Sequence, residues 1–168
     1  MTKLVASDHL RTPEYILDRV RALGQIALDP CGNDDDTVGA WVQLRGADRD
    51  SCGLATPWER HLAPEYGRTL VFVNCPYGRG HLDPWTLKIV EEASKGCEVV
   101  SLLPLDPTTK WWKRMASTAQ ARVMIDHRVQ FIGGSHKSGS IKSALFYHGT
   151  RPHLFLHHCG DLGEGVRL

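Results

Sequence analysis

Apolar runs alternate with helix-like periodic stretches along the first two thirds of the chain. Residues 11–24, RTPEYILDRVRALG, place apolar side chains three to four positions apart, with Pro13 suited to a first turn and Gly24 to an end. This spacing predicts a helix. The run that follows, QIALDPCGND, is short and apolar and ends on Asp-Pro, which predicts a strand that opens into a polar loop.

In the middle of the chain, the sequence predicts loops up to about residue 68 and strands and helices after it. Residues 34–68 are rich in Gly, Asp, Arg and Pro and contain one brief apolar run, AWVQL, so we expect loops and one short strand. TLVFVN then predicts a buried strand, and DPWTLKIVEEASKG predicts a helix capped by Asp83, with Pro84 at its first position and Gly96 at its end. CEVVSLLP predicts another buried strand and PTTKWWKRMASTA another helix.

Three further β-like runs complete the pattern: ARVMIDHRVQFIGG, SALFYHG and HLFLHH. Strands that alternate with helices, followed by strands alone, predict an α/β fold whose sheet is mostly parallel with an antiparallel C-terminal portion. The length of 168 residues suits a single domain, residues 1–168, and leaves no room for a separate target-recognition domain.

Composition narrows the class of protein without identifying it. Hydrophobic residues make up 42% and charged residues 23%, as in globular proteins, and no low-complexity tract indicates disorder. Neither a signal peptide nor an apolar run of roughly 20 residues is present, so we expect no membrane segment and a cytoplasmic location. The net charge of +1 leaves a nucleic-acid partner open, and basic residues gather in RGADR, GRG, KWWKR and HKSGSIK.

Cysteine and histidine spacing argues against a metal site. The five cysteines lack the C-x-x-C spacing of metal sites or a disulfide framework, so we expect free thiols. The stretch HLFLHHC matches no metal-ligand spacing, and we interpret it as a terminal strand or flexible end with histidines facing solvent.

Two of the predicted strands, in IALDPCGN and VFVNCPYG, end on polar residues. Ligands of open α/β sheets bind at the carboxyl ends of the strands, so these ends could form two halves of one site. In the second, Asn74 offers a side-chain carbonyl, and the carbonyl of Cys75 has no amide partner at Pro76. Tyr77 adds an aromatic face. Two acceptors beside an aromatic ring can hold a planar amine and increase the electron density on its nitrogen.

These residues resemble a known family. The stretches TPEYILDRV, LDPCGN, GLATPW, VFVNCPYGRG, PW, LLP and WW follow the order and approximate spacing of the S-adenosylmethionine-dependent amino-methyltransferases. The closer resemblance is to the small phage-type DNA N6-adenine methyltransferases. The resemblance implies a Rossmann-like class I methyltransferase sheet, S-adenosylmethionine as cofactor, DNA as substrate, and a phage-infected or prophage-bearing bacterial cell. The family usually has proline where this chain has Cys75.

By this resemblance, the base-binding and catalytic residues are Asn74, Cys75, Pro76 and Tyr77. The residues implied to bind the cofactor are Thr12, Pro13, Asp29, Pro30, Cys31, Gly32, Asn33 and Leu54. Arg79 in GRG and Lys137 in HKSGSIK are the candidate DNA contacts. Trp111 and Trp112 are adjacent and so point in different directions, and we expect at least one of them to pack in the core.

The function implied is methylation of the exocyclic N6 amine of adenine in DNA, with the base extruded from the duplex. Methylation of cytosine N4 stays open as an alternative, since that amine fits the same acceptors. A module of the same fold that binds cofactor or DNA without turnover is a second alternative. Cys75 is not expected to act as a nucleophile, because the Pro-Cys pair of cytosine C5 chemistry is not found at this position. The oligomeric state is not indicated.

Overall fold

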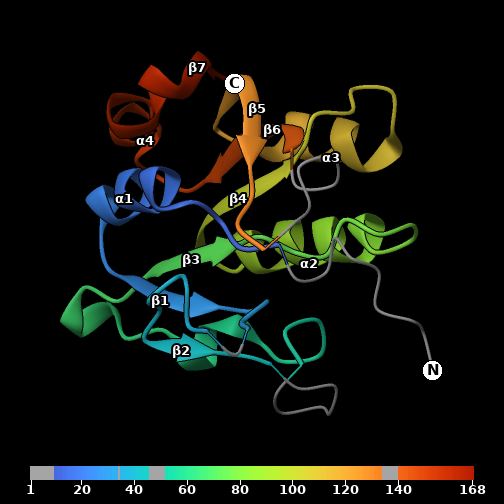
Figure 1. Ribbon diagram of the computed structural model, residues 1–168. Coiled ribbons are helices and arrows are strands. Elements are labelled where there is room, and N and C mark those ends of the chain that lie inside the picture. The colour runs from blue at the N-terminus through green and yellow to red at the C-terminus, as the bar shows by residue number, and fades with distance from the viewer. Residues whose placement is uncertain (1–9, 34, 46–51, 134–139) are drawn as a thin grey trace.

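A mixed sheet with helices on both faces forms the centre of the molecule (Figure 1). The computed structural model describes residues 10–33, 35–45, 52–133 and 140–168. Within these ranges the sheet has seven strands, in the spatial order β2-β1-β3-β4-β6-β5-β7. Their bounds are β1 Ile26–Asp29, β2 Val42–Gln43, β3 Leu70–Val73, β4 Glu98–Pro104, β5 Ala121–Gln130, β6 Ser140–His148 and β7 Gly163–Arg167.

Strand direction changes after β4. The neighbours β2, β1, β3 and β4 are parallel, β6 is antiparallel to β4, and β5 is antiparallel to β6. It follows that β5 runs in the direction of the first four strands, while β7 opposes β5 at the edge. The predicted α/β sheet, mostly parallel at first and antiparallel later, is confirmed at this level.

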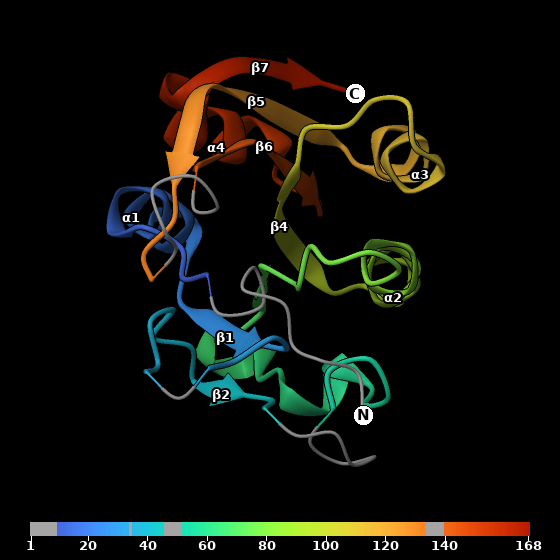
Figure 2. The same cartoon turned by 45° about the vertical axis from the view of Figure 1, so that its right-hand side comes forward.

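The faces of the sheet are covered by helices (Figure 2). The helices are α1 Glu14–Leu23, α2 Leu82–Ser94, α3 Lys110–Thr118 and α4 Pro152–Cys159. Leu70 and Phe72 of β3 pack into one hydrophobic cluster with α1 and α4, whereas Val71 and Val73 pack into another with α2 and α3. Because successive side chains of a strand point to opposite faces, β3 is buried on both sides, as its continuous apolar run predicted.

Local sequence signals explain where several helices begin. Pro13, expected in the first turn, stands at the position just before α1. The Thr109 hydroxyl oxygen caps α3 by accepting from the backbone N–H of Trp112 at 3.3 Å. Both Trp111 and Trp112 are buried, and the Trp112 ring lies 4.9 Å from that of Phe146 between centroids. These tryptophans therefore pack in the core.

Two predictions about elements were wrong, and one strand was missed. The run HLFLHH is helix α4, because Pro152, Phe155 and Cys159 are its buried positions and have helical spacing. Strand β7 was missed, since its sequence GEGVR has almost no apolar character. Asp83 is not a cap and Pro84 is not at the first position, because α2 begins at Leu82. The Asp83 carboxylate instead accepts from Arg114 of α3 at 2.9 Å.

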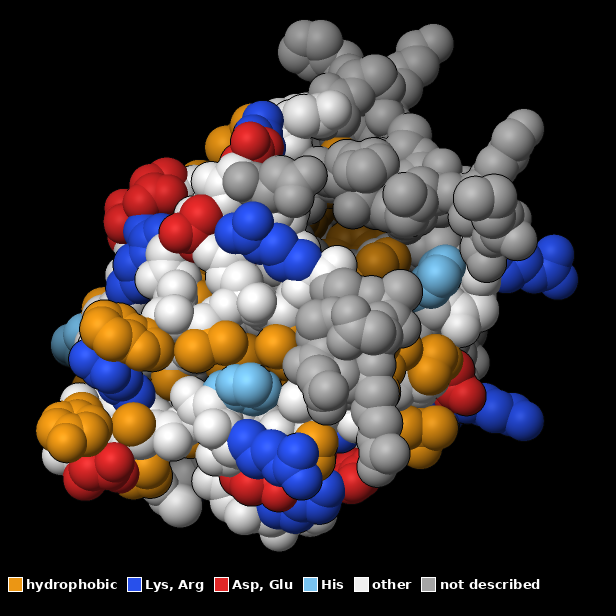
Figure 3. Space-filling model, turned by 90° about the horizontal axis from the view of Figure 1, so that it is seen from below, with side chains coloured by type: hydrophobic (Ala, Val, Ile, Leu, Met, Phe, Trp, Pro, Cys, Tyr) orange, Lys and Arg blue, Asp and Glu red, His pale blue; other side chains and the backbone are white. Residues whose placement is uncertain are grey.

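The side of the molecule beyond β2 exposes hydrophobic side chains beside basic ones (Figure 3). Trp41, directly before β2, is 59% exposed, and the guanidinium of Arg68 lies 3.3 Å from the centre of its ring. No helix in the described ranges is long and apolar enough to cross a membrane. In the same ranges, no group of three or more His, Cys, Asp or Glu side chains is placed to hold a metal ion.

Candidate active site

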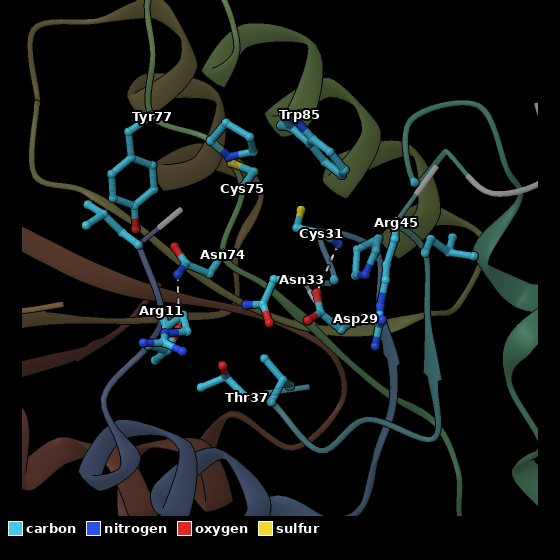
Figure 4. A pocket seen from close by; sticks show the side chains of 18 of the residues that line it. Arg11, Asp29, Cys31, Asn33, Thr37, Arg45, Asn74, Cys75, Tyr77 and Trp85 are labelled. Carbon is cyan, nitrogen blue, oxygen red and sulfur yellow. Dashed lines mark hydrogen bonds between the residues drawn. The ribbon is translucent and has the colours of Figure 1, made fainter. Parts of the chain in front are cut away.

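A cavity of about 260 Å³ opens where the parallel strands β1 and β3 end (Figure 4). Asp29 is the last residue of β1, and Asn74 directly follows β3. Because neighbouring parallel strands end at the same edge of the sheet, these two side chains line one cavity although the chain separates them widely. Tyr77 and Asn74 lie on one side of the cavity, and Asp29 and Arg45 lie on the other (Figure 4).

Asp29 is a buried carboxylate at the floor of the cavity. Its side chain is only 4% exposed, and its Oδ1 accepts from the Cys31 backbone N–H at 2.9 Å. Burial raises the pKa of Asp29 from 3.8 to about 7, although the bond from Cys31 opposes this shift. A carboxyl group with a pKa near 7 is suited to a cationic or hydroxyl-bearing ligand, because such a ligand would favour the ionised form of the carboxyl group.

Asn74 is oriented by a residue that lies 62 positions earlier in the chain. Its side-chain N–H donates to the Thr12 hydroxyl oxygen at 3.0 Å, and Thr12 is only 2% exposed. Because the amide nitrogen is bound in this way, the amide oxygen faces the Tyr77 side of the cavity (Figure 4). In the described part of the chain this oxygen accepts no hydrogen bond, so it is available to a donor in the cavity.

Cys75 contributes its backbone to the cavity wall. Among the described residues no donor bonds to its carbonyl, and Pro76, which follows, has no N–H. The thiol is 3% exposed, and burial raises its pKa to about 12. A thiol with this pKa remains protonated near neutral pH, which agrees with the expectation that Cys75 is not a nucleophile.

Tyr77 is held at both ends of its side chain. Its hydroxyl donates to the carbonyl of Leu102 in β4 at 2.8 Å, and its ring packs edge-to-face on Phe131 with centroids 5.9 Å apart. Burial raises the pKa of the Tyr77 hydroxyl well above its usual value, so it stays a donor. These contacts fix the plane of the ring at the cavity wall.

Close backbone packing shapes the Asp29 side of the cavity. A Cβ atom at Gly53 would lie 2.1 Å from the Pro30 carbonyl oxygen, so only glycine allows these two segments to approach. The indole N–H of Trp58 donates to the Gly53 carbonyl at 2.8 Å and holds this segment in place. The loop after β1 is tied to the residue that follows β2, because the Gly32 N–H donates to the Leu44 carbonyl at 3.1 Å.

Most of the residues expected at the site do line this cavity. They are Thr12, Asp29, Pro30, Cys31, Gly32, Asn33, Asn74, Cys75, Pro76 and Tyr77. Pro13 does not line it, because its place is at the start of α1, and Leu54 packs against the core cluster that contains α2 and α3. Arg79 is exposed in the loop that follows Tyr77. Lys137 lies outside the described residues.

Several lining residues were not anticipated from the sequence. They are Leu10, Arg11, Thr37, Val38, Leu44, Arg45, Cys52, Gly53 and Trp85. Cys52 and Gly53 immediately precede Leu54, the residue that was expected at the site. The stretch GLATPW therefore lies next to the cavity, but the lining residues are one or two positions before Leu54. Arg11 forms an ion pair with Asp35, which no sequence periodicity indicates.

An open α/β sheet with a polar cavity across two adjacent strand ends is typical of nucleotide- and cofactor-binding proteins. Comparison with known families gives a more specific class. The family model described as DNA N-6-adenine-methyltransferase (Dam) matches residues 1–146 of the 168. The chain therefore belongs to the Dam family of DNA N6-adenine methyltransferases. No curated protein and no solved structure gave a match.

Proposed function

We propose that this protein is an S-adenosylmethionine-dependent enzyme that methylates the N6 amine of adenine in DNA. One observation carries the proposal: the free acceptors of Asn74 and Cys75 lie in the same cavity as the buried carboxylate of Asp29. Family membership supports the same reaction. The two sides of the cavity offer one region for a base and another for a cofactor.

The residues on the Asp29 side fit S-adenosylmethionine. Asp29 retains an oxygen beyond the one bonded to Cys31, and its raised pKa means that a hydrogen-bond donor or cation would stabilise the carboxylate. Gly32 and Gly53 keep the walls narrow, because neither position has space for a side chain. We assign Asp29, Cys31, Gly32 and Asn33 to the cofactor. When bound, S-adenosylmethionine supplies a methyl group activated by the positive charge on its sulfur.

The residues on the Asn74 side fit a flipped adenine. The amide oxygen of Asn74 and the carbonyl of Cys75 would accept the two hydrogens of the N6 amine, which raises the electron density on nitrogen. Tyr77 offers a fixed ring against which the base could stack. Catalysis would then rest on alignment and on these acceptors rather than on a strong general base.

The sheet is consistent with a Rossmann-like methyltransferase core. Strand β6 is reversed and lies between β4 and β5, which both run in the direction of β1. The pair β1 and β3 lies at the centre of the parallel part, where the loops that follow the strands can reach one ligand. We propose that this single domain performs the reaction without a separate recognition domain.

Mass spectrometry of nucleosides tests the proposal. DNA is incubated with purified protein and cofactor carrying a deuterated methyl group, then digested. Labelled N6-methyladenine is the expected product, while labelled N4-methylcytosine would correct the substrate but keep the mechanism. Protein that binds the cofactor by calorimetry and labels neither base would contradict the proposal and favour a binding module.

A further inference from the structure

The outer part of the β5–β6 ribbon extends beyond the rest of the sheet. Two register pairs, Met124 with Ala144 and Arg128 with Lys142, show that β5 carries three residues opposite one residue of β6. Such a bulge bends a ribbon. Beyond it, residues 128–130 pair with residues 140–142, and we call this part the β5–β6 arm.

The arm ends beside the candidate active site. The end of β5 points away from β7 and lies beside α1 (Figure 2). Arg11, which lines the cavity, exchanges two backbone hydrogen bonds of 3.0 Å with Ile132, two residues past β5. Phe131, just past the arm, packs on Tyr77. Three residues of extended chain span roughly 10 Å, so Arg128 lies about that far from Phe131, which contacts Tyr77.

The two faces of the arm differ in character. Val129 is fully buried and Ile141 is half-buried, and both pack against the cluster that contains α1 and α4. Arg128 and Lys142 therefore point to the other face, where both are exposed. Since they are direct cross-strand partners, their Cβ atoms are about 5 Å apart, and like charges at this spacing destabilise a sheet.

No carboxylate in the described part of the chain neutralises this pair. Arg128 donates through one Nη1 hydrogen to the Ser140 carbonyl at 3.0 Å, and Lys142 forms no ion pair there. The nearby carboxylate of Asp126 is bonded to His127 at 2.8 Å. Two adjacent cations without a counter-ion make a site suited to an external anion.

We propose that the Arg128–Lys142 pair binds a backbone phosphate of DNA and so holds the duplex beside the base pocket. This inference rests on the proposed function, since it assigns a surface to the substrate of that site. A phosphate compensates the repulsion between the two cations, which explains why the arm carries both. The contact is made to the backbone, so it adds affinity without sequence preference.

The salt dependence of DNA binding tests this inference. The double variant Arg128→Gln/Lys142→Gln and the wild type are titrated with a fluorescent duplex from 50 to 300 mM salt. The slope of log K against log salt should become shallower by about 0.9 in the variant, because the pair contacts one phosphate and each lost phosphate contact removes about that much. The change should be equal for duplexes of unrelated sequence. The melting temperature should stay the same or rise, because a repulsive pair has been removed.

A matched control removes the same charge elsewhere. Arg60→Gln/Arg167→Gln changes two exposed arginines, of which Arg167 pairs with Ala121 at the far end of β5, and should keep the wild-type slope. An arm variant with the wild-type slope, or a control with the same loss as the arm variant, would overturn the inference. Methyl transfer is measured on the same wild-type preparation. If the salt slope becomes shallower in the arm variant but the wild type transfers no methyl group, the phosphate contact of the arm is supported and the proposed function is refuted.

Discussion

The side-chain amide of Asn74 donates to the hydroxyl oxygen of Thr12 at 3.0 Å, across 62 positions of the chain. This bond joins the segment before α1 to the loop after β3. It also determines which atom of the Asn74 amide faces the cavity, since the nitrogen is occupied and the oxygen is left for a ligand. Thr12 therefore acts as a positioning residue for the proposed base-binding acceptor.

Replacing Thr12 by Val should disturb catalysis through Asn74. The substitution keeps the shape but removes the acceptor, so the partly buried amide donor of Asn74 loses its partner, at a cost of about 1 kcal/mol. We expect methyl transfer to fall by about tenfold and the unfolding free energy to decrease. Thr12→Ser keeps the hydroxyl and should retain most of the activity, measured by initial rates. Equal rates for the Val and Ser variants would show that this bond does not position Asn74.

Replacing Cys75 by Ala should leave methyl transfer within about threefold of wild type, a difference worth less than 1 kcal/mol. The proposed contribution of Cys75 is its backbone carbonyl, and its buried thiol has a pKa raised to about 12. Rates measured at saturating cofactor provide the check. If Cys75→Ala lost activity completely while its melting curve stayed normal, the thiol would be part of the chemistry after all.

Asp29 should make stability depend on pH. Burial raises its folded pKa to about 7 from 3.8, so the folded state binds more protons than the unfolded state between these values. Stability from this group is therefore fully present below about pH 4 and is lost as the pH rises toward 7. One pKa unit corresponds to about 1.4 kcal/mol, so the loss amounts to up to roughly 4 kcal/mol.

The variant Asp29→Asn removes this dependence. Urea denaturation between pH 4 and pH 8 should show wild type losing stability relative to the variant across that window. Glu164→Gln, at an exposed position on β7, serves as the control and should follow wild type. A constant difference between wild type and Asp29→Asn at every pH would refute the raised pKa.

Much of the fold could be predicted because its signals are local. The buried strand β3 is a continuous apolar run, and β4 is mostly apolar, with Ser101 in its middle. Helix α1 has both apolar spacing and a flanking Pro13 and Gly24. Strand β7 gave no such signal. A Cβ at Gly163 would lie 2.0 Å from the carbonyl oxygen of Met124, so this strand needs glycine for its close approach to β5. Contacts of that kind depend on the tertiary structure.

The candidate site was predictable where residues follow strand ends. Asp29 and Asn74 were expected in one site because parallel strands end at the same edge, and both line the cavity. Arg11 and Cys52 come from irregular segments, whose path depends on packing that periodicity does not encode. The same reason explains why Leu54 was chosen in place of its neighbour Gly53.

Gly53→Ala tests this packing directly. The added Cβ would meet the Pro30 carbonyl at 2.1 Å, so the loop after β1 must move. We expect a loss of stability of about 1–3 kcal/mol, as for overpacked sites, and a weaker affinity for the cofactor by calorimetry. Gly160→Ala is the matched control, because nothing lies within 4 Å of its added Cβ. Equal stability and affinity of the two variants would contradict the assigned cavity wall.

The most direct test of the central claim is the rate of methyl transfer to adenine by Asn74→Ala at saturating cofactor. Loss of a transition-state acceptor typically lowers the rate by about 10²–10³-fold, and we expect a decrease of that size with cofactor affinity preserved. Asn74→Asp keeps an acceptor and should retain more activity than the Ala variant. An Asn74→Ala protein that methylates DNA at the wild-type rate would contradict the assignment of this cavity as the active site.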